Sequence, residues 1–120
     1  MTIHADLRSD TITLPSDAMK QAMIEAELGD DVLGDEPTVL KLQDTVATLF
    51  GKEAACFVPS GTMANQAAIR AQTQPGDEII THRDNHIYLY ESGAWAAISG
   101  CSIQLLDGDG GQFDAQSVLA

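Results

Sequence analysis

The sequence predicts an α/β domain with a mainly parallel sheet covered by helices. Segments with helical periodicity alternate along the chain with short apolar segments typical of strands. Such alternation implies crossover connections between parallel strands, with helices covering the sheet. The chain has 120 residues, of which 44% are hydrophobic, and it contains neither an internal repeat nor a low-complexity tract. A chain of this length and composition can form one domain with a sizeable core.

Two helices are predicted in the first half of the chain. Residues 16–26 place alanines and methionines on one face, and Ser16 is a suitable N-cap. Residues 38–50 repeat valine and leucine at helical spacing and stop at Gly51. The loop at residues 28–37 holds two glycines and four acidic residues, without the regular spacing of a calcium loop. We expect these charges to be solvated at a turn or a subunit contact.

Strands and helices are predicted to alternate in the second half. Residues 54–58 form a continuous apolar run, typical of a strand buried on both faces. The other expected elements are a helix at 63–71, a turn at 75–77, strands at 78–81 and 102–106, a helix at 88–99, a loop at 107–111 and a helix that opens at 114–120. That last helix has no stop signal, and three or so parallel strands would leave wide unpaired edges. We therefore expect residues 1–120 to be the N-terminal portion of a larger domain, incomplete at the C-terminus.

The composition is strongly acidic. Asp and Glu number 18 against 6 Lys and Arg, for a formal net charge of -12. This balance argues against nucleic acid and against anionic membrane surfaces, and no apolar run approaches the roughly 20 residues of a membrane-spanning helix. Residues 1–10 show no basic segment followed by an apolar one, so a cytoplasmic location is expected. Cys56 and Cys101 lie in apolar runs and are predicted to be small buried core residues.

The sharpest local signal is the turn around Ser60, Gly61 and Thr62. The preceding apolar run breaks at Pro59, and a helix follows. The first amides of a helix lack intrahelical partners and carry partial positive charge, so they bind anions without basic side chains. Gly61 allows a ligand close to the backbone, and the two hydroxyls can donate hydrogen bonds. A phosphate site is one interpretation; an ordinary N-cap is the other.

Two of the three histidines follow a predicted strand. His82 and His86 lie where the carboxyl end of a parallel strand would place a ligand site, and His86 stands just before a helix. The loop between them does not present both rings on one face, so no metal site is predicted. For each histidine, a capping or hydrogen-bonded structural role is the alternative. His4, near the N-terminus, is expected to be inert.

Five segments, taken together, resemble the low-specificity L-threonine aldolases. In order, they are residues 6–11 (DLRSDT), 29–39 (GDDVLGDEPTV), 51–55 (GKEAA), 59–65 (PSGTMAN) and 86–88 (HIY). That family consists of pyridoxal-phosphate lyases with the aspartate-aminotransferase-like fold (fold type I). The resemblance spans nearly all of the chain, and five segments in register are more specific than any one of them. It implies that the chain is the front part of the large, cofactor-binding domain.

The resemblance assigns roles to individual residues. Ser60, Gly61 and Thr62 match the turn that holds the cofactor phosphate. His86 matches the histidine that stacks on the pyridine ring near the substrate hydroxyl, and Ser9 matches a serine near the substrate carboxylate. Without the resemblance, the segment around Ser9 would be interpreted as a solvated N-terminal arm. The loop at residues 29–36 resembles a segment near the subunit interface, which implies a homo-oligomer, a dimer or a tetramer.

The implied activity is cleavage of L-threonine, and of L-allo-threonine, to glycine and acetaldehyde. His86, directly or through water, is a candidate base or hydroxyl-orienting group. Leu33 stands where the family often has tyrosine, which changes the expected pocket wall and bears on substrate preference.

The expected site is incomplete within this chain. The family's cofactor-binding lysine, its aspartate facing the pyridine nitrogen and its carboxylate-gripping arginines lie downstream and are not matched here. Lys20, Lys41 and Lys52 are predicted to be exposed, and none is nominated for the cofactor. The 120-residue chain alone is therefore expected to be inactive. The alternatives are another pyridoxal-phosphate lyase or transaminase of the same fold, or a non-catalytic truncated remnant that binds phosphate ligands or pairs with a full-length subunit.

Overall fold

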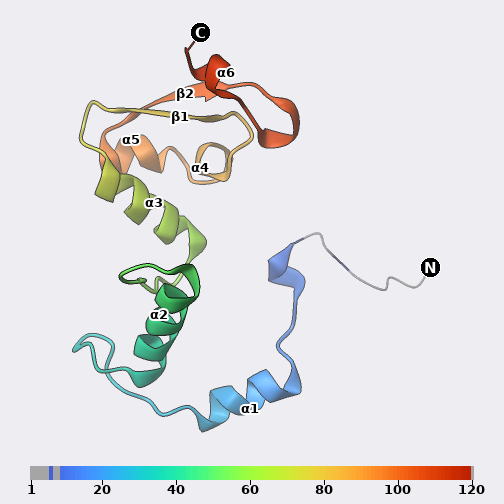
Figure 1. Ribbon diagram of the computed structural model, residues 1–120, viewed down its shortest axis with the longest axis vertical. Coiled ribbons are helices and arrows are strands. Elements are labelled where there is room, and N and C mark those ends of the chain that lie inside the picture. Colours follow the sequence, from blue (N-terminus) through green and yellow to red (C-terminus); the bar gives the residue numbers. More distant parts are fainter. Residues whose placement is uncertain (1–5, 7–8, 120) are drawn as a thin grey trace. The chain divides into compact units, whose positions relative to one another are not determined.

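The computed structural model describes residue 6 and residues 9–119, which belong to two compact units (Figure 1). The first unit is Met1–Phe57 and the second is Val58–Ala120. His4, Leu7 and Arg8, which entered the sequence analysis, lie outside the described residues.

The first unit is helical. The short 3₁₀ helix η1 (Asp10–Ile12) precedes α1 (Asp17–Glu25) and α2 (Pro37–Phe50). The Ser16 side chain caps α1 by accepting a hydrogen bond from the Met19 amide. Helix α2 ends at Gly51, whose φ of 59° lies in the left-handed region that favours glycine. Both predicted helices are confirmed to within one residue at each end.

The acidic loop before α2 is closed by its own carboxylates. Glu36 Oε2 accepts a hydrogen bond from the Gly29 amide at 2.5 Å, and Asp35 Oδ1 accepts one from the Asp30 amide at 2.9 Å. Asp30 Oδ1 in turn accepts from the Val32 amide at 2.8 Å. These three charges therefore bind the backbone of the turn as well as facing solvent.

Acidification should open this loop. The hydrogen bond from Gly29 lowers the pKa of Glu36 below its ordinary value, and the Thr38 amide lowers it further. Because the folded-state pKa is depressed, the contribution of Glu36 is present above the ordinary carboxyl range and is lost as the pH falls through the folded value. We expect the Gly29 amide resonance to titrate with a midpoint below that of an unfolded glutamate. A midpoint at or above the ordinary value in a two-dimensional ¹H–¹⁵N spectrum would contradict this account.

The predicted strand at residues 54–58 is wrong. These residues have no regular secondary structure, and Phe57 is 49% exposed. A strand needs a neighbour for its backbone groups, and within the described residues none pairs with this segment. The Phe57 amide instead donates to Gln43 Oε1 at 2.8 Å. The prediction that Cys56 is buried is also wrong, whereas Cys101 is buried, with 5% exposed.

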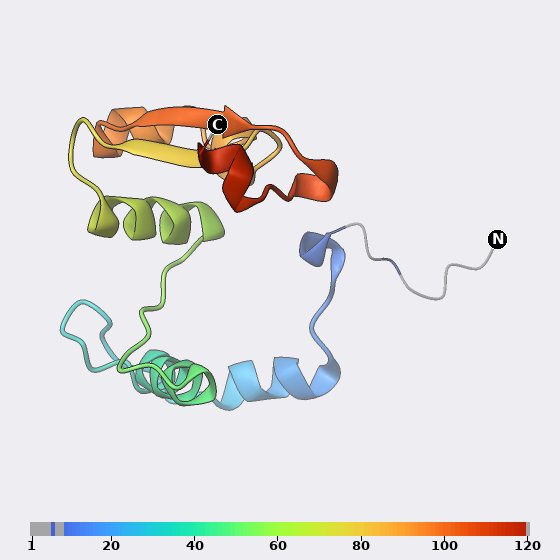
Figure 2. The same cartoon turned by 45° about the horizontal axis from the view of Figure 1, so that its top comes forward.

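The second unit contains a parallel strand pair with helices against it. Strands β1 (Glu78–His82) and β2 (Ser102–Leu106) pair in register from Glu78 opposite Ser102 to His82 opposite Leu106. Helix α3 (Gly61–Gln72) packs against α5 (Ala94–Ser99), and α5 packs against β2 (Figures 1 and 2). The predicted α/β class with parallel strands is confirmed, although the described residues contain two strands rather than three.

The predicted helix at residues 88–99 is interrupted. It is replaced by α4 (His86–Leu89) and α5, and between them Ser92 and Gly93 have φ values of 53° and 72°. A right-handed helix cannot continue through two left-handed residues. Glu91, which lies between the end of α4 and these two residues, is buried, with only 4% exposed.

The described core is small and largely polar. Its buried apolar residues are Cys101 and Leu106, with 5% and 9% exposed. The buried polar residues are Gln66, Thr81, His82, Glu91 and Ser99. Beyond β2 the chain forms the 3₁₀ helix η2 (Asp109–Gly111) and α6 (Ala115–Leu119), so the predicted helix opening is confirmed. Among the residues that the structure describes, no helix is both long and apolar enough to cross a bilayer.

Candidate functional site

The N-terminus of α3 is open and has two unused amides. Ser60 caps the helix: its Oγ accepts from the Met63 amide at 3.1 Å, and its carbonyl accepts from the Ala64 amide at 3.0 Å. The N–H groups of Gly61 and Thr62 have no acceptor in the described part of the chain. A Cβ added at Gly61 would meet no atom within 4 Å. The N-cap interpretation thus holds for Ser60 and leaves two amides that can bind an anion.

His86 is the first residue of α4. The helix is capped by Asn85, whose Oδ1 accepts from the Ile87 amide at 3.1 Å. The imidazole is 59% exposed, and the Tyr90 ring lies 5.2 Å from it between centroids, tilted by 46°. Its Nδ1 lies 2.8 Å from Glu91 Oε1. One nitrogen is therefore bound to a buried carboxylate, while much of the ring remains accessible to a ligand.

Glu91 connects His86 to helix α3. Its Oε1 accepts from Asn65 Nδ2 at 2.7 Å as well as from His86, and its Oε2 accepts from Gln66 Nε2 at 2.5 Å. Burial by itself would raise the pKa of Glu91, but the hydrogen bonds from Asn65, Gln66 and His86 outweigh it and lower the pKa below the ordinary value. Glu91 is accordingly a buried, ionised acceptor of three hydrogen bonds.

The structure thus links two of the predicted site elements. Asn65 lies in the same helix as Gly61, four residues farther along, which corresponds to a rise of about 6 Å. Helix α3, through Asn65, and the ring of His86 are joined through a single buried carboxylate in the second unit.

His82 has a structural role. It is buried, with 4% exposed, and its Nδ1 accepts a hydrogen bond from the Asp84 amide at 3.1 Å. The other nitrogen, Nε2, therefore carries the proton and donates to the Gly108 carbonyl at 3.1 Å. This pair of bonds fastens the loop after β2 to the end of β1. No group of three metal-ligating side chains occurs among the residues described.

Ser9 belongs to the first unit, and its side chain contacts Thr11. Its Oγ accepts from the Thr11 amide at 3.2 Å and lies 2.8 Å from the Thr11 hydroxyl, so that it caps η1. The side chains of Lys20, Lys41 and Lys52 lie on exposed residues, as predicted.

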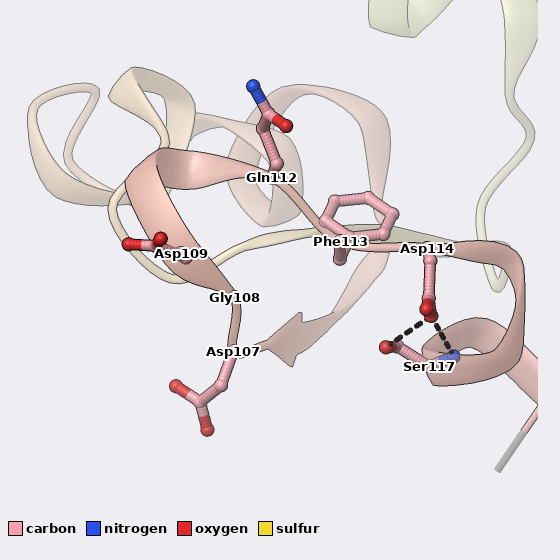
Figure 3. Close-up of a pocket in the computed structure, with 7 residues that line it drawn as sticks. All are labelled: Asp107, Gly108, Asp109, Gln112, Phe113, Asp114 and Ser117. Carbon is pink, nitrogen blue, oxygen red and sulfur yellow. Dashed lines mark hydrogen bonds between the residues drawn. The ribbon is translucent and has the colours of Figure 1, made fainter.

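A separate hollow of about 340 Å³ lies beyond β2 (Figure 3). It is lined by Asp107, Gly108, Asp109, Gln112, Phe113, Asp114 and Ser117, and none of the predicted site residues takes part. The hydrogen bonds from the Ser117 amide and hydroxyl, each 2.8 Å long, lower the pKa of Asp114 and occupy one of its oxygens. The three aspartates do not converge on one point in Figure 3.

Sequence reasoning missed the roles of Asn65, Gln66 and Glu91. The one available signal was a glutamate five residues after His86. In a continuous helix, residues three and four apart share a face, so the predicted helix at residues 88–99 gave no reason to pair Glu91 with His86. Because α4 ends at Leu89, Glu91 lies outside the helix and within hydrogen-bond distance of His86.

Comparison with known protein families identifies the family of the chain. The sequence model of the beta-eliminating lyases matches residues 6–120, nearly the whole chain. The chain belongs to this family. The predicted resemblance and the α/β fold class are confirmed at that level.

Several curated relatives carry a more specific name. The chain is 50% identical over 102 residues to the low specificity L-threonine aldolase of Escherichia coli strain K12, covering 85% of this chain and 31% of that protein. It is 49% identical over 96 residues to a probable low-specificity L-threonine aldolase of Arabidopsis thaliana, covering 79% and 27%. The Saccharomyces cerevisiae low specificity L-threonine aldolase is 42% identical over 100 residues, covering 82% and 26%. The chain thus spans about a quarter to a third of the length of the curated relatives it matches.

Proposed function

We propose that the full gene product is a pyridoxal-phosphate-dependent threonine aldolase that cleaves L-threonine and L-allo-threonine to glycine and acetaldehyde. Residues 1–120 form the N-terminal portion of its cofactor-binding domain and supply part of the site. The observation that carries this proposal is the hydrogen-bonded connection from α3 through Glu91 to His86. It is supported by relatives named for threonine aldolase activity.

The turn of Ser60, Gly61 and Thr62 suits the phosphate of the cofactor. Two unused amides at the positive end of a helix attract an anion, and the exposed Thr62 hydroxyl adds a donor. The space in front of Gly61 is empty within 4 Å, which allows a phosphate oxygen close to the backbone. No basic side chain is required, in agreement with a chain of net charge -12.

Bound pyridoxal phosphate would take up the electron pair released when the Cα–Cβ bond of the substrate breaks. His86, whose side chain is 59% exposed, is proposed to stack on the cofactor's pyridine ring and to accept the proton of the β-hydroxyl group. Ser9 is proposed to bind the substrate carboxylate. Leu33, an exposed residue of the acidic loop, replaces a polar group on the pocket wall and is expected to affect substrate preference.

Thr62→Ala should weaken cofactor binding without unfolding the protein. Loss of one hydrogen bond to phosphate is expected to cost roughly 0.5–1.5 kcal/mol of binding free energy. Thr48→Ala, an exposed threonine of α2, is the matched control. Fluorescence titration of the apoenzyme with pyridoxal phosphate measures both affinities, and equal affinities would remove Thr62 from the phosphate site.

The products distinguish the proposed activity from its alternatives. The full gene product is incubated with pyridoxal phosphate and L-threonine, and the mixture is analysed for acetaldehyde, glycine and 2-oxo acids. Equimolar glycine and acetaldehyde are expected. A 2-oxo acid formed only with an amino acceptor would indicate a transaminase. The absence of any product, with cofactor bound, would indicate a non-catalytic protein.

We further propose that the protein acts in the cytoplasm as a homo-oligomer. The support is the exposed apolar surface of the acidic loop, where Leu28, Val32 and Leu33 have no cover in the described residues. Apolar residues clustered on a surface are typical of interfaces. Light scattering on the full gene product should give a mass of two or four subunits.

A further inference from the structure

We propose that Glu91 is a positioning residue that holds the His86 imidazole with its proton on Nδ1, so that the lone pair of Nε2 is free for the substrate's β-hydroxyl group. The inference rests on the proposed function, because it assigns Nε2 the role of base. The geometry that carries it is the contact between Glu91 and His86 and the two further donors that surround the same carboxylate.

The carboxylate decides which nitrogen is protonated. An ionised carboxylate only accepts hydrogen bonds, so the 2.8 Å contact with Glu91 Oε1 requires a proton on His86 Nδ1. In the neutral ring the other nitrogen, Nε2, is then the acceptor. Within the described residues no partner is recorded for Nε2, and the side chain is 59% exposed. The basic nitrogen is thereby left on the accessible side of the ring.

Gln66 is the third donor to the Glu91 carboxylate, and its orientation fits a charged acceptor. Its Nε2 is directed at Glu91 Oε2, while its own Oε1 is buried and has no hydrogen-bond partner in the described part of the chain. A buried oxygen without a partner is costly, so the amide orientation needs compensation. A charged acceptor at 2.5 Å provides it, because hydrogen bonds to ionised groups are about twice as strong as neutral ones.

The arrangement fits a proton transfer. When Nε2 takes the proton of the β-hydroxyl group, the O–H bond breaks, an N–H bond forms and the ring becomes a cation. Glu91 is then 2.8 Å from a positive ring and stabilises it. With the proton on Nε2 instead, the accessible nitrogen would be a donor and could not act as a base. Asn65 and Gln66 also connect the Glu91 carboxylate to α3, the helix whose first turn is proposed to hold the phosphate.

The tautomer is measured directly by ¹⁵N NMR of the full gene product in its cofactor-free form, with ¹⁵N-labelled histidine. The His86 signals are assigned by their loss in His86→Asn. The wild-type spectrum should show a protonated Nδ1 and an unprotonated Nε2. Glu91→Gln, which keeps the size and loses the charge, should reduce the Nδ1-protonated fraction, because its amide group no longer demands a donor at that position. Glu27→Gln, an exposed glutamate, is the matched control and should leave the spectrum unchanged.

Three results would overturn the proposal: an Nε2-protonated ring in the wild type, an unchanged tautomer in a folded Glu91→Gln variant, or an equal change in the control. If Glu91→Gln does not fold, Glu91→Asp is the second variant. It keeps the charge, but its side chain is one methylene shorter, so the carboxylate lies farther from His86 Nδ1. The Nδ1-protonated fraction should again fall.

Kinetics provide a separate readout. With cofactor and L-threonine, Glu91→Gln should lower kcat by up to about 10²-fold with little change in KM. A protein with the expected tautomer but no aldolase products would refute the proposed function and leave the positioning role intact. If the protein is an active aldolase but Glu91→Gln changes neither the His86 tautomer nor kcat, the positioning role is refuted and the proposed function stands.

Discussion

His86→Ala is expected to lower kcat for L-threonine cleavage by about 10²–10⁴-fold, the usual contribution of a general base. The stability of the fold should change little, because the imidazole is 59% exposed and buries little surface. Glu91 retains the donors Asn65 and Gln66 in the variant, so its carboxylate stays compensated. Steady-state kinetics and a thermal melt of the same sample test both parts.

His82→Ala is the contrasting variant. This ring is buried and holds the Gly108 carbonyl and the Asp84 amide, so its removal should cost roughly 1–3 kcal/mol of stability. Turnover per folded molecule should remain. The assignment of the two histidines is wrong if His86→Ala leaves kcat unchanged. It is also wrong if His82→Ala lowers the turnover per folded molecule.

Gly29→Ala should disrupt the start of α2. A Cβ at this position would collide with the Asp35 carbonyl oxygen and lie 2.9 Å from Glu36 Cα and Pro37 Cδ. These are backbone and ring atoms that cannot rotate away, so the loop must move and the bond from the Gly29 amide to Glu36 is strained or lost. A destabilisation of about 1–3 kcal/mol is expected, as for other overpacked sites.

Hydrogen exchange measured by mass spectrometry localises this effect. Residues 29–38 should exchange faster in Gly29→Ala than in the wild type. Gly61→Ala is the matched control for stability, since a Cβ there meets nothing within 4 Å, and exchange in residues 29–38 should be unchanged. Equal protection in Gly29→Ala would show that the loop accommodates the methyl group.

Local signals predicted most of the secondary structure. The caps at Ser16 and Gly51 fixed the helix ends, and strand β2 has the predicted bounds because its apolar run is flanked by polar residues and glycines. The failure at residues 54–58 has a non-local cause. That segment has strand composition, but a strand exists only through its neighbours, and the described residues provide none.

The candidate site was predictable only in part. The free amides at α3 follow from a turn and a helix start that are visible in the sequence, as does the position of His86 at the start of a helix. The part played by Glu91 depends on the end of α4 at Leu89, and no glycine or proline directly follows that residue to mark the end in the sequence. The contacts of Asn65 and Gln66 with a residue 25 or 26 positions away have no local signature at all.

A crystal structure of the full gene product grown with pyridoxal phosphate tests the central claim most directly. The account predicts that the phosphate accepts hydrogen bonds from the Gly61 and Thr62 amides, with the His86 ring against the pyridine and Glu91 on its Nδ1. A cofactor whose phosphate is bound elsewhere, with the start of α3 facing only solvent, would contradict it.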